Sequence, residues 1–291
     1  MDKKLRRIAI GIQYDGTPYC GWQSQIKQAT VQDHIEDAIT KFIGDDVKKI
    51  LRVTAAGRTD TGVHALGQVA HFDTDIDRPD WSWVRGLNSF LPFTISIQWA
   101  KEVSFDFDAR RSAYERSYVY FLMNSPIRTP LLHHKAGYNM LPLAKPFMID
   151  EMRLAAQFLL GEHDFTCFRS SECQSLSPIK TIHQLDIAQD GSRVFFLLRA
   201  NAFLHHMVRN IVGTLLQVGI GKKSVDWVKE ILQQRDRSLA APTFSADGLY
   251  LAKVSYPENF QIPAPDFGQS VIPELILNQA FCQPLQERVI S

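Results

Sequence analysis

The chain has 291 residues, 45% of them hydrophobic and 22% charged, with a formal net charge of +1 at pH 7. These totals are typical of a soluble globular protein with one large domain or two modest ones. No apolar run approaches the ~20 residues that span a bilayer, and the four cysteines form no Cys-x-x-Cys pair, so neither a membrane span nor a structural zinc site is indicated.

The N-terminal part of the sequence predicts a strand, a helix and a second strand. Residues Ile8–Tyr14 alternate with period two, which indicates a half-buried strand and argues against a secretory signal peptide. A cytoplasmic protein is therefore expected. Thr30 can cap a helix that starts at Val31 and ends at Gly44, and Gln68–Phe72 predicts the second strand. Three further elements are expected, a helix at 81–91 and strands at 95–99 and 115–123.

The region after residue 123 begins with a proline-bearing stretch, 124–148, that we expect to be an exposed irregular loop. Asp150 is expected to cap the helix that follows, and Asp190-Gly191 predicts the turn of a hairpin. The elements expected from here on are helices at 151–160, 205–218 and 225–233 and strands at 183–188, 193–200 and 249–255.

The predicted fold class is α+β with a large antiparallel or mixed sheet, because hairpins favour antiparallel pairing. Three parts are expected: an N-terminal lobe over residues 1–112, a C-terminal lobe over 113–257 and an extended tail over 258–291. Residues 257–291 hold five of the fourteen prolines and a net charge of −3, which leaves +4 for the rest of the chain. That charge permits a nucleic-acid partner but does not by itself indicate one.

The segment AAGRTDTGVHALGQVAHF, residues 55–72, contains the strongest candidate for chemistry. Asp60 stands among glycines and small residues, which present a carboxylate that can act as nucleophile, base or metal ligand. An Asx turn is the simpler interpretation. Arg58 lies two residues away and, in an extended stretch, on the same side as Asp60. The two form either a surface ion pair or a site in which a guanidinium meets phosphate or base beside a reactive carboxylate.

Histidines raise a second possibility, a metal-dependent nucleic-acid hydrolase that uses His64, His71 and His205. We expect no metal, because neighbouring helical residues such as His205 and His206 point ~100° apart. Packing or hydrogen bonding is the simpler role for each ring. Arg209 borders the apolar stripe of the helix expected at 205–218. It is either a snorkelling side chain or a cation that keeps a carboxylate ionised.

Tyr118 lies on the strand expected at 115–123, with Tyr120 on the same face. An aromatic residue on a strand usually belongs to a core. At the edge of a cleft, a tyrosine can instead stack on a nucleobase, an interaction worth ~1–3 kcal/mol.

Five stretches of the sequence together resemble the tRNA pseudouridine synthase A family. They are YDGTPYCGWQSQ (14–25), AAGRTDTGVHALGQVAHF (55–72), LLGEHDFTCFR (159–169), NAFLHHMVRNIVGTL (201–215) and ADGLYLAKVSYP (246–257). The most specific signal is RTDTGVH followed, in the right order, by HHMVRN.

The resemblance implies two similar lobes joined through a large mixed or antiparallel sheet, with helices on one face and an active-site cleft between the lobes. It implies an isomerase that converts uridine to pseudouridine in the anticodon stem-loop of tRNA, at positions 38, 39 and 40 of the tRNA. A homodimer without cofactor is also implied. The alternative from another class is a non-catalytic tRNA-binding protein of the same fold.

The matched motifs also imply the site residues. Asp60 matches the catalytic aspartate, and Arg58 matches the arginine associated with the flipped nucleotide. Tyr118 matches the active-site tyrosine. Arg209 matches the arginine that pairs with the aspartate, and Leu249 in GLYL matches an apolar wall of the pocket. Separately from the resemblance, the flanking basic residues expected to contact phosphates are Arg110, Arg111, Arg116, Arg128, Lys135, Arg169 and Lys180.

Overall fold

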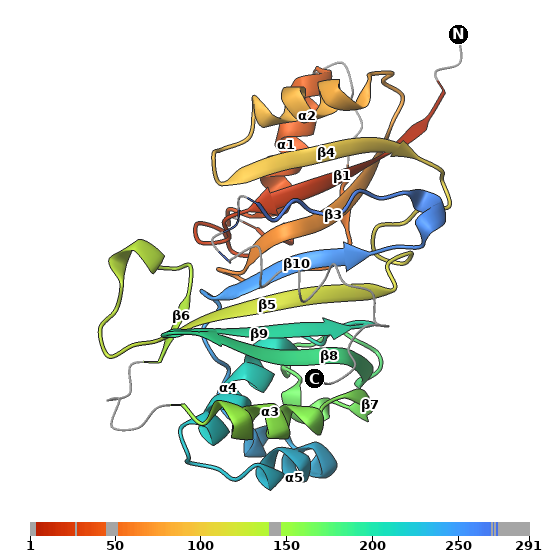
Figure 1. Cartoon of the computed structure of the whole chain (residues 1–291). Coiled ribbons are helices and arrows are strands. Elements are labelled where there is room, and N and C mark those ends of the chain that lie inside the picture. The colour runs from red at the N-terminus through yellow and green to blue at the C-terminus, as the bar shows by residue number, and fades with distance from the viewer. Residues whose placement is uncertain are drawn as a thin grey trace. The chain divides into compact units, whose positions relative to one another are not determined.

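The structure is a computed structural model that describes residues 4–26, 28–44, 52–139, 147–268, 270 and 272 (Figure 1). The chain divides into two compact units. Unit 1 comprises the described residues of Met1–Arg116 and Tyr250–Pro265, and unit 2 those of Ser117–Leu249 and Asp266–Ser291. Both units combine strands with helices, so the predicted α+β class is confirmed. The domain boundaries predicted at residues 112 and 257 stay a prediction. In the described part of the chain, no helix has the length and apolar character needed to cross a membrane.

Unit 1 is built around its first strand. Its elements are β1 (Arg6–Tyr14), α1 (Val31–Ile43), β2 (Thr54–Ala55), β3 (His64–Thr74), α2 (Asp80–Asn88), β4 (Ile95–Val103) and, except for its first residue, β10 (Leu249–Ser255). β1 pairs antiparallel with β3 and with β4, whereas β10 pairs parallel with β3 through Tyr250 and Leu251. This unit therefore holds a mixed sheet, one of the two sheet types that the sequence predicts.

The helices of unit 1 are fixed on the sheet by Trp83. Its fully buried ring lies edge-on to Phe42 from α1 and to Phe72 from β3, with centroids 5.4 Å apart in both pairs. α1 has the predicted ends: the Thr30 hydroxyl accepts from the N–H of Asp33 at 3.3 Å, and Gly44 follows the last turn with φ 90°. Local capping chemistry therefore sets the helix that covers the sheet.

Unit 2 combines an antiparallel hairpin with three helices among its described residues. Its elements are β5 (Glu115–Asn124, of which the first two residues belong to unit 1), β6 (Gly137–Asn139), α3 (Ile149–Gln157), β7 (Gly161–Asp164), β8 (Ile179–Asp190), β9 (Arg193–Ala200), α4 (Met207–Gly219) and α5 (Asp226–Gln234). β8 and β9 pair from Ile182↔Ala200 to Asp190↔Arg193, so the predicted hairpin is confirmed. The predicted apolar stripe of α4 is buried throughout.

Two predicted helix starts in unit 2 are wrong. Asp150 does not cap a helix: α3 begins at Ile149, and Asp150 lies in its first turn, where a negative charge favours the helix N-terminus. α4 begins at Met207 rather than His205, because His206 has a φ of 63°, a left-handed conformation that does not continue a right-handed helix.

The stretch 124–148 is not wholly irregular. β6 pairs parallel with β5 through Gly137, Tyr138 and Asn139, and Pro130–Leu132 forms a 3₁₀ turn. Residues 140–146 of the predicted loop lie outside the described residues. A three-residue strand has too few side chains to give a period-two pattern, so only its pairing with β5 reveals it.

The segment after Ser255 packs on unit 1 as far as Pro265. Phe260, in a short 3₁₀ turn, lies edge-on to Phe107 with centroids 5.3 Å apart, and Lys101 Nζ donates to the carbonyl of Gln261 at 2.9 Å. The composition of this segment predicts a tail outside the core, yet these residues cover part of unit 1. Residues 269, 271 and 273–291 of the predicted tail lie outside the described residues.

Candidate active site

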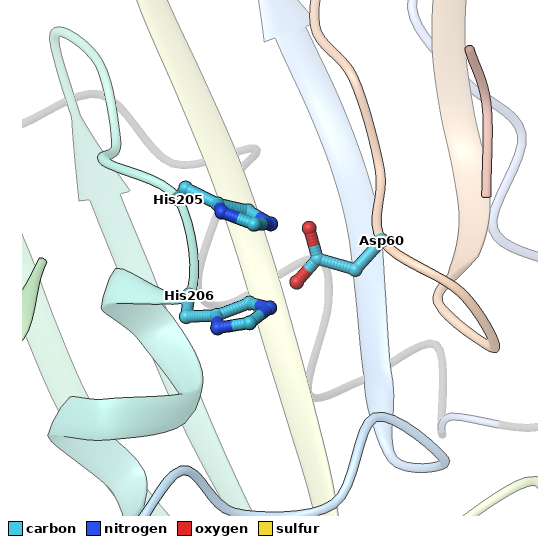
Figure 2. A group of neighbouring side chains, drawn as sticks. All are labelled: Asp60, His205 and His206. Carbon is cyan, nitrogen blue, oxygen red and sulfur yellow. The ribbon is translucent and has the colours of Figure 1, made fainter. Parts of the chain in front are cut away.

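Asp60 lies on the loop that connects β2 to β3 in unit 1 (Figure 2). Burial alternates along this loop, since Arg58 is exposed, Thr59 is buried and Asp60 is half-buried. The side chain that packs inward is Thr59, which leaves Arg58 and Asp60 on the opposite side of the chain. This is the placement that an extended stretch predicts for an arginine and a carboxylate two residues apart.

Thr59 anchors the Asp60 loop. Its hydroxyl shares a buried hydrogen bond of 2.8 Å with Tyr14 Oη, and its carbonyl accepts from the N–H of Trp22 at 3.0 Å. On the other side of Arg58, Gln68 Nε2 donates to the carbonyl of Gly57 at 2.8 Å. The backbone is therefore fixed on both sides of Arg58 and directly before Asp60.

Two glycines shape the backbone next to Asp60. Gly62 has a φ of 78° and lies in a turn that the N–H of Val63 closes by donating to the Asp60 carbonyl at 3.1 Å. Gly21 has a φ of 85°, and a Cβ at this position would lie 2.6 Å from the Thr59 carbonyl oxygen. The loop that carries Gly21 therefore passes against the Asp60 loop at a distance that only a residue without a side chain permits.

His64, one of the three histidines in the metal hypothesis, has structural contacts in unit 1. Its Nδ1 lies 3.1 Å from the N–H of Gly16 and 3.1 Å from Asp15 Oδ1, and its ring stacks on Tyr250 with centroids 4.6 Å apart. These contacts are those of a packing and hydrogen-bonding side chain, the simpler of the two interpretations.

His71 also has a structural role. Its Nδ1 accepts from the N–H of Ala109 at 3.1 Å. Burial lowers the pKa of His71, and the positive charge of Arg7 lowers it further. A neutral ring is therefore favoured, and only a neutral ring has the lone pair that accepts from Ala109.

Arg209 is the third residue of α4 in unit 2. It is half-buried, and its Nε donates to the carbonyl of Phe244 at 2.8 Å. His205 and His206 directly precede the helix, and their rings are neighbours with centroids 3.9 Å apart (Figure 2). The expectation that these two rings diverge by ~100° is wrong, because it assumes that both residues are helical.

The two remaining predicted site residues also lie in unit 2. Tyr118, on β5, is half-buried, and its ring meets Phe203 edge-on at 5.0 Å between centroids. Leu249 is the first residue of β10 and is buried. The structure therefore brings Arg58 and Asp60 together on one loop of unit 1 and places Tyr118, Arg209 and Leu249 in unit 2.

Three basic residues expected to contact phosphates instead hold the fold. The Arg116 guanidinium donates to three backbone carbonyls of unit 1, and Arg169 and Lys180 each donate to two backbone carbonyls of unit 2. Lys180 is nearly buried, and this burial lowers its pKa. Of the remaining candidates, Arg110, Arg111 and Arg128 are exposed and Lys135 is half-buried.

The residues that support Asp60 were not found from the sequence. Tyr14 gives only the pattern of a strand end, and the contacts of Gly21 join segments far apart in the chain. Gln68 carries a usable signal, because it is a fully buried polar residue in the apolar strand β3. A buried amide needs a partner, and here that partner is the backbone of the Asp60 loop.

This arrangement presents a carboxylate on a fixed backbone beside an exposed guanidinium. Such a carboxylate can attack an electrophilic carbon or remove a proton, and a guanidinium can bind phosphate or stack on a base. Fixed placement matters because a displacement of ~1 Å in a reacting group can lower a rate by ~10²-fold. The loop therefore has the properties of a catalytic segment.

Residues 10–110 and 155–257 match a family model described as tRNA pseudouridine synthase. The matched ranges contain Arg58, Asp60, Arg209 and Leu249, whereas Tyr118 lies between them. The class of protein is therefore that of the pseudouridine synthases, and the predicted pseudouridine synthase fold and enzymatic activity are confirmed.

Curated relatives carry the name tRNA pseudouridine synthase A. The one from Polynucleobacter asymbioticus is 53% identical over 274 residues, which cover 94% of this chain and all of that protein. The one from Paraburkholderia phytofirmans is 54% identical over 264 residues, which cover 91% of this chain and 95% of that protein. The chain belongs to the tRNA pseudouridine synthase A family.

Solved structures give a weaker likeness. An archaeal box H/ACA sRNP Nop10–Cbf5 complex aligns with a TM-score of 0.31 and 12% sequence identity, over 80% of this chain and 59% of that chain. This score is too low to support a conclusion about either unit.

Proposed function

We propose that this tRNA-modifying isomerase converts uridine to pseudouridine in the anticodon stem-loop, at tRNA positions 38, 39 and 40, with Asp60 as the catalytic residue. The observation that carries the proposal is the Asp60 loop, in which buried Thr59 is held by Tyr14 and Trp22 and the carboxylate is left on the outer side. The sequence resemblance and the relatives' shared name support tRNA as the substrate.

The reaction conserves every heavy atom of the nucleoside. The bond from N1 of the base to C1′ of the sugar breaks, the base turns, and C5 forms the new bond to C1′. C5 then loses its proton, and N1 gains one. C1′ becomes electron-poor as the first bond breaks, as it does in glycoside hydrolysis. Asp60 acts on the sugar, either by attack at C1′ or as the base that leads to a glycal-like intermediate.

The other site residues are proposed to handle the base. A uridine stacked in a stem or loop must be flipped out, at a cost of a few kcal/mol. Arg58, exposed beside Asp60, braces the space that the base leaves. Tyr118 accepts or positions the proton lost from C5, and Arg209 and Leu249 bind the flipped nucleoside.

Tritium release tests the role of Asp60. Uridine labelled with tritium at C5 loses the label to water when pseudouridine forms. Asp60→Asn is expected to bind tRNA with an affinity within a few fold of the wild type. Its rate of tritium release is expected to fall by a factor of roughly 10³ or more. Asp37→Asn is the matched control, because Asp37 forms a surface ion pair with Lys41 on α1. Unchanged release from Asp60→Asn excludes the proposed role.

Two further arms separate the alternatives. Undetectable release from the wild type, with tRNA binding intact, supports a non-catalytic tRNA-binding protein. Loss of release in excess chelator supports a metal-dependent mechanism, whereas the proposal expects full activity. Pseudouridine mapping on the product tRNA then tests the positions, and a modified uridine outside 38–40 contradicts that part of the proposal.

Assembly and location are part of the same proposal. The family resemblance supports a homodimer that modifies tRNA in the cytoplasm. Light scattering on the purified chain tests the first point, with a mass of twice 33.1 kDa expected. Fractionation of the source cells tests the second.

A further inference from the structure

The residues from Asp108 to Tyr114, in unit 1, form a turn with its own internal support. Asp108 Oδ1 accepts from the backbone N–H groups of Arg110 and Arg111, each at 2.9 Å. Ser112 closes the turn, because its Oγ accepts from the N–H of Asp108 at 3.0 Å and its N–H donates to the Asp108 carbonyl at 2.9 Å. A single oxygen atom of Asp108 therefore sets the backbone of both arginines.

This turn, which we call the Asp108 turn, is anchored to the sheet through Ala109. The N–H of Ala109 donates to His71 Nδ1 at 3.1 Å, and its carbonyl accepts from Tyr256 Oη at 2.6 Å. Ala109, His71 and Tyr256 are all buried. His71 belongs to β3, and Tyr256 directly follows β10. Because these two side chains bind both the N–H and the carbonyl of Ala109, the turn has a fixed position in unit 1.

Arg116 connects the Asp108 turn to the Asp60 loop. Its guanidinium donates to the carbonyls of Ala113 and Arg110, each at 2.8 Å, and to the carbonyl of Ala56 at 3.1 Å. Ala56 lies two residues before Arg58 in the sequence. Within unit 1, the turn is therefore held beside the segment that carries the proposed catalytic residue.

The side chains of Arg110 and Arg111 are exposed on this fixed turn, and so is Tyr114, at 56% of its surface. Among the described residues of the chain, neither guanidinium makes a hydrogen bond, ion pair or ring contact. Other arginines of unit 1 are engaged with carboxylates or aromatic rings: Arg6, Arg7, Arg52, Arg78 and Arg85. The Asp108 turn therefore presents two guanidinium groups whose hydrogen-bond donors have no partner in the described part of the chain.

We propose that the Asp108 turn is an RNA-backbone-binding surface, in which Arg110 and Arg111 contact phosphates and Asp108 is the positioning residue. The inference rests on the proposed function in one respect, namely that an RNA substrate comes to the Asp60 loop. Guanidinium groups match phosphate in charge and in hydrogen-bond geometry, and contacts to phosphate set the register of a protein on RNA. Tyr114 adds an exposed ring on which a base can stack.

The positioning role of Asp108 has an unusual consequence. Burial raises the pKa of the Asp108 carboxyl, but the N–H groups of Arg111 and Arg110, together with the electrostatic contributions of His71 and Arg111, outweigh it, and the pKa lies below its usual value. The turn therefore holds an anion beside a surface that binds anions. On net charge alone, removal of this carboxylate strengthens RNA binding. If the carboxylate pre-organises the two arginines, its removal weakens binding instead.

Two substitutions of Asp108 separate these effects. Asp108→Asn and Asp108→Ala remove the same charge, but only asparagine keeps an Oδ1 that accepts from the two N–H groups. Affinity for the unmodified tRNA is measured by fluorescence anisotropy over a range of salt concentrations, with thermal unfolding as the check on the fold. We expect Asp108→Asn to bind at least as tightly as the wild type, and Asp108→Ala to bind roughly three- to tenfold more weakly than Asp108→Asn. Equal affinities for the two variants overturn the positioning role.

The phosphate contacts are tested by Arg110→Gln/Arg111→Gln. This variant is expected to bind tRNA roughly tenfold more weakly than the wild type. The plot of log affinity against log salt concentration should become shallower, its negative slope decreasing in magnitude by about 1.5–2. The matched control, Lys222→Gln/Lys223→Gln, removes the same charge from an exposed turn of unit 2 and should change the slope little. Equal slopes for the double arginine variant and the wild type overturn the proposal, even if Asp108→Asn and Asp108→Ala differ in their affinity for tRNA.

The outcomes separate this inference from the proposed function. A wild type that binds tRNA but releases no tritium contradicts the proposed isomerisation and leaves the affinity comparisons intact as a test of the surface. A wild type that makes pseudouridine, with an unchanged salt slope in the double arginine variant, overturns only the surface. A wild type that does not bind RNA overturns both.

Discussion

Substitution of Gly21 by alanine tests whether the close approach of two loops positions Asp60. The new Cβ would lie 2.6 Å from the Thr59 carbonyl oxygen and 3.1 Å from the Asp60 carbonyl carbon, whereas ordinary contact begins at 3.4 Å. The backbone at residues 59 and 60 must therefore move by about 0.8 Å, the difference between 3.4 and 2.6 Å. Both neighbouring atoms belong to backbone, so no side-chain rotation relieves the overlap.

The expected cost has two parts. An alanine with the φ of 85° found at Gly21 costs ~1–2 kcal/mol in backbone strain, and overpacking adds ~1–3 kcal/mol. The unfolding free energy should therefore fall by ~2–5 kcal/mol. A displacement of nearly 1 Å at a catalytic group lowers turnover by ~10²-fold.

Gly44→Ala is the matched control. Gly44 has a similar φ of 90°, and a Cβ there meets nothing within 4 Å. This variant should lose only the ~1–3 kcal/mol of its own backbone strain and keep its turnover within a few fold. Urea unfolding and tritium release, measured well below the unfolding temperature, give both quantities. If Gly21→Ala matches Gly44→Ala in stability and in turnover, the two loops do not position Asp60.

Two further predictions concern the residues around this loop. Tyr14→Phe removes a partner of the buried Thr59 hydroxyl and should lower the unfolding free energy by ~1–3 kcal/mol, whereas the double variant Tyr14→Phe/Thr59→Val should recover much of that loss in urea unfolding. For His71, whose folded pKa is lowered, the unfolded chain takes up a proton that the folded chain refuses, so stability should decrease as pH falls below the unfolded value of ~6.5. His71→Asn keeps an acceptor for the N–H of Ala109 but cannot titrate. Its unfolding free energy, measured by urea unfolding between pH 5 and 7, should therefore depend less on pH than that of the wild type. An equal pH dependence contradicts the role of His71 in the loss of stability.

Local signals in the sequence predicted the elements whose ends depend on neighbouring residues. α1 is the clearest case, because the cap at Thr30 and the glycine at 44 lie within the helix's own segment. The start of α4 was mistaken since His206 carries no local mark of its left-handed conformation. β6 was missed for a similar reason, because its definition lies in its pairing with β5.

The candidate site divides in the same way. Asp60 stands out in the sequence because small residues and glycines surround it, and the family resemblance then assigns it a role. Gln68 stands out only as a polar residue in an apolar strand, which does not name its partner. Tyr14 and Gly21 do not stand out, because their contacts with the Asp60 loop join residues far apart in the chain. These long-range contacts depend on how the chain folds, and a single sequence does not show them.

Unit 1 draws on both early and late segments of the chain, since β10 pairs with β3 and Pro265 packs on Gly67. During synthesis the ribosome makes all of residues 117–249 between the two segments, and at ~5–20 residues per second this takes on the order of 10 s. For that interval the emerging N-terminal strands lack β10 as a neighbour. The Asp60 loop, which leads directly into β3, therefore reaches its final support only after β10 has been synthesised.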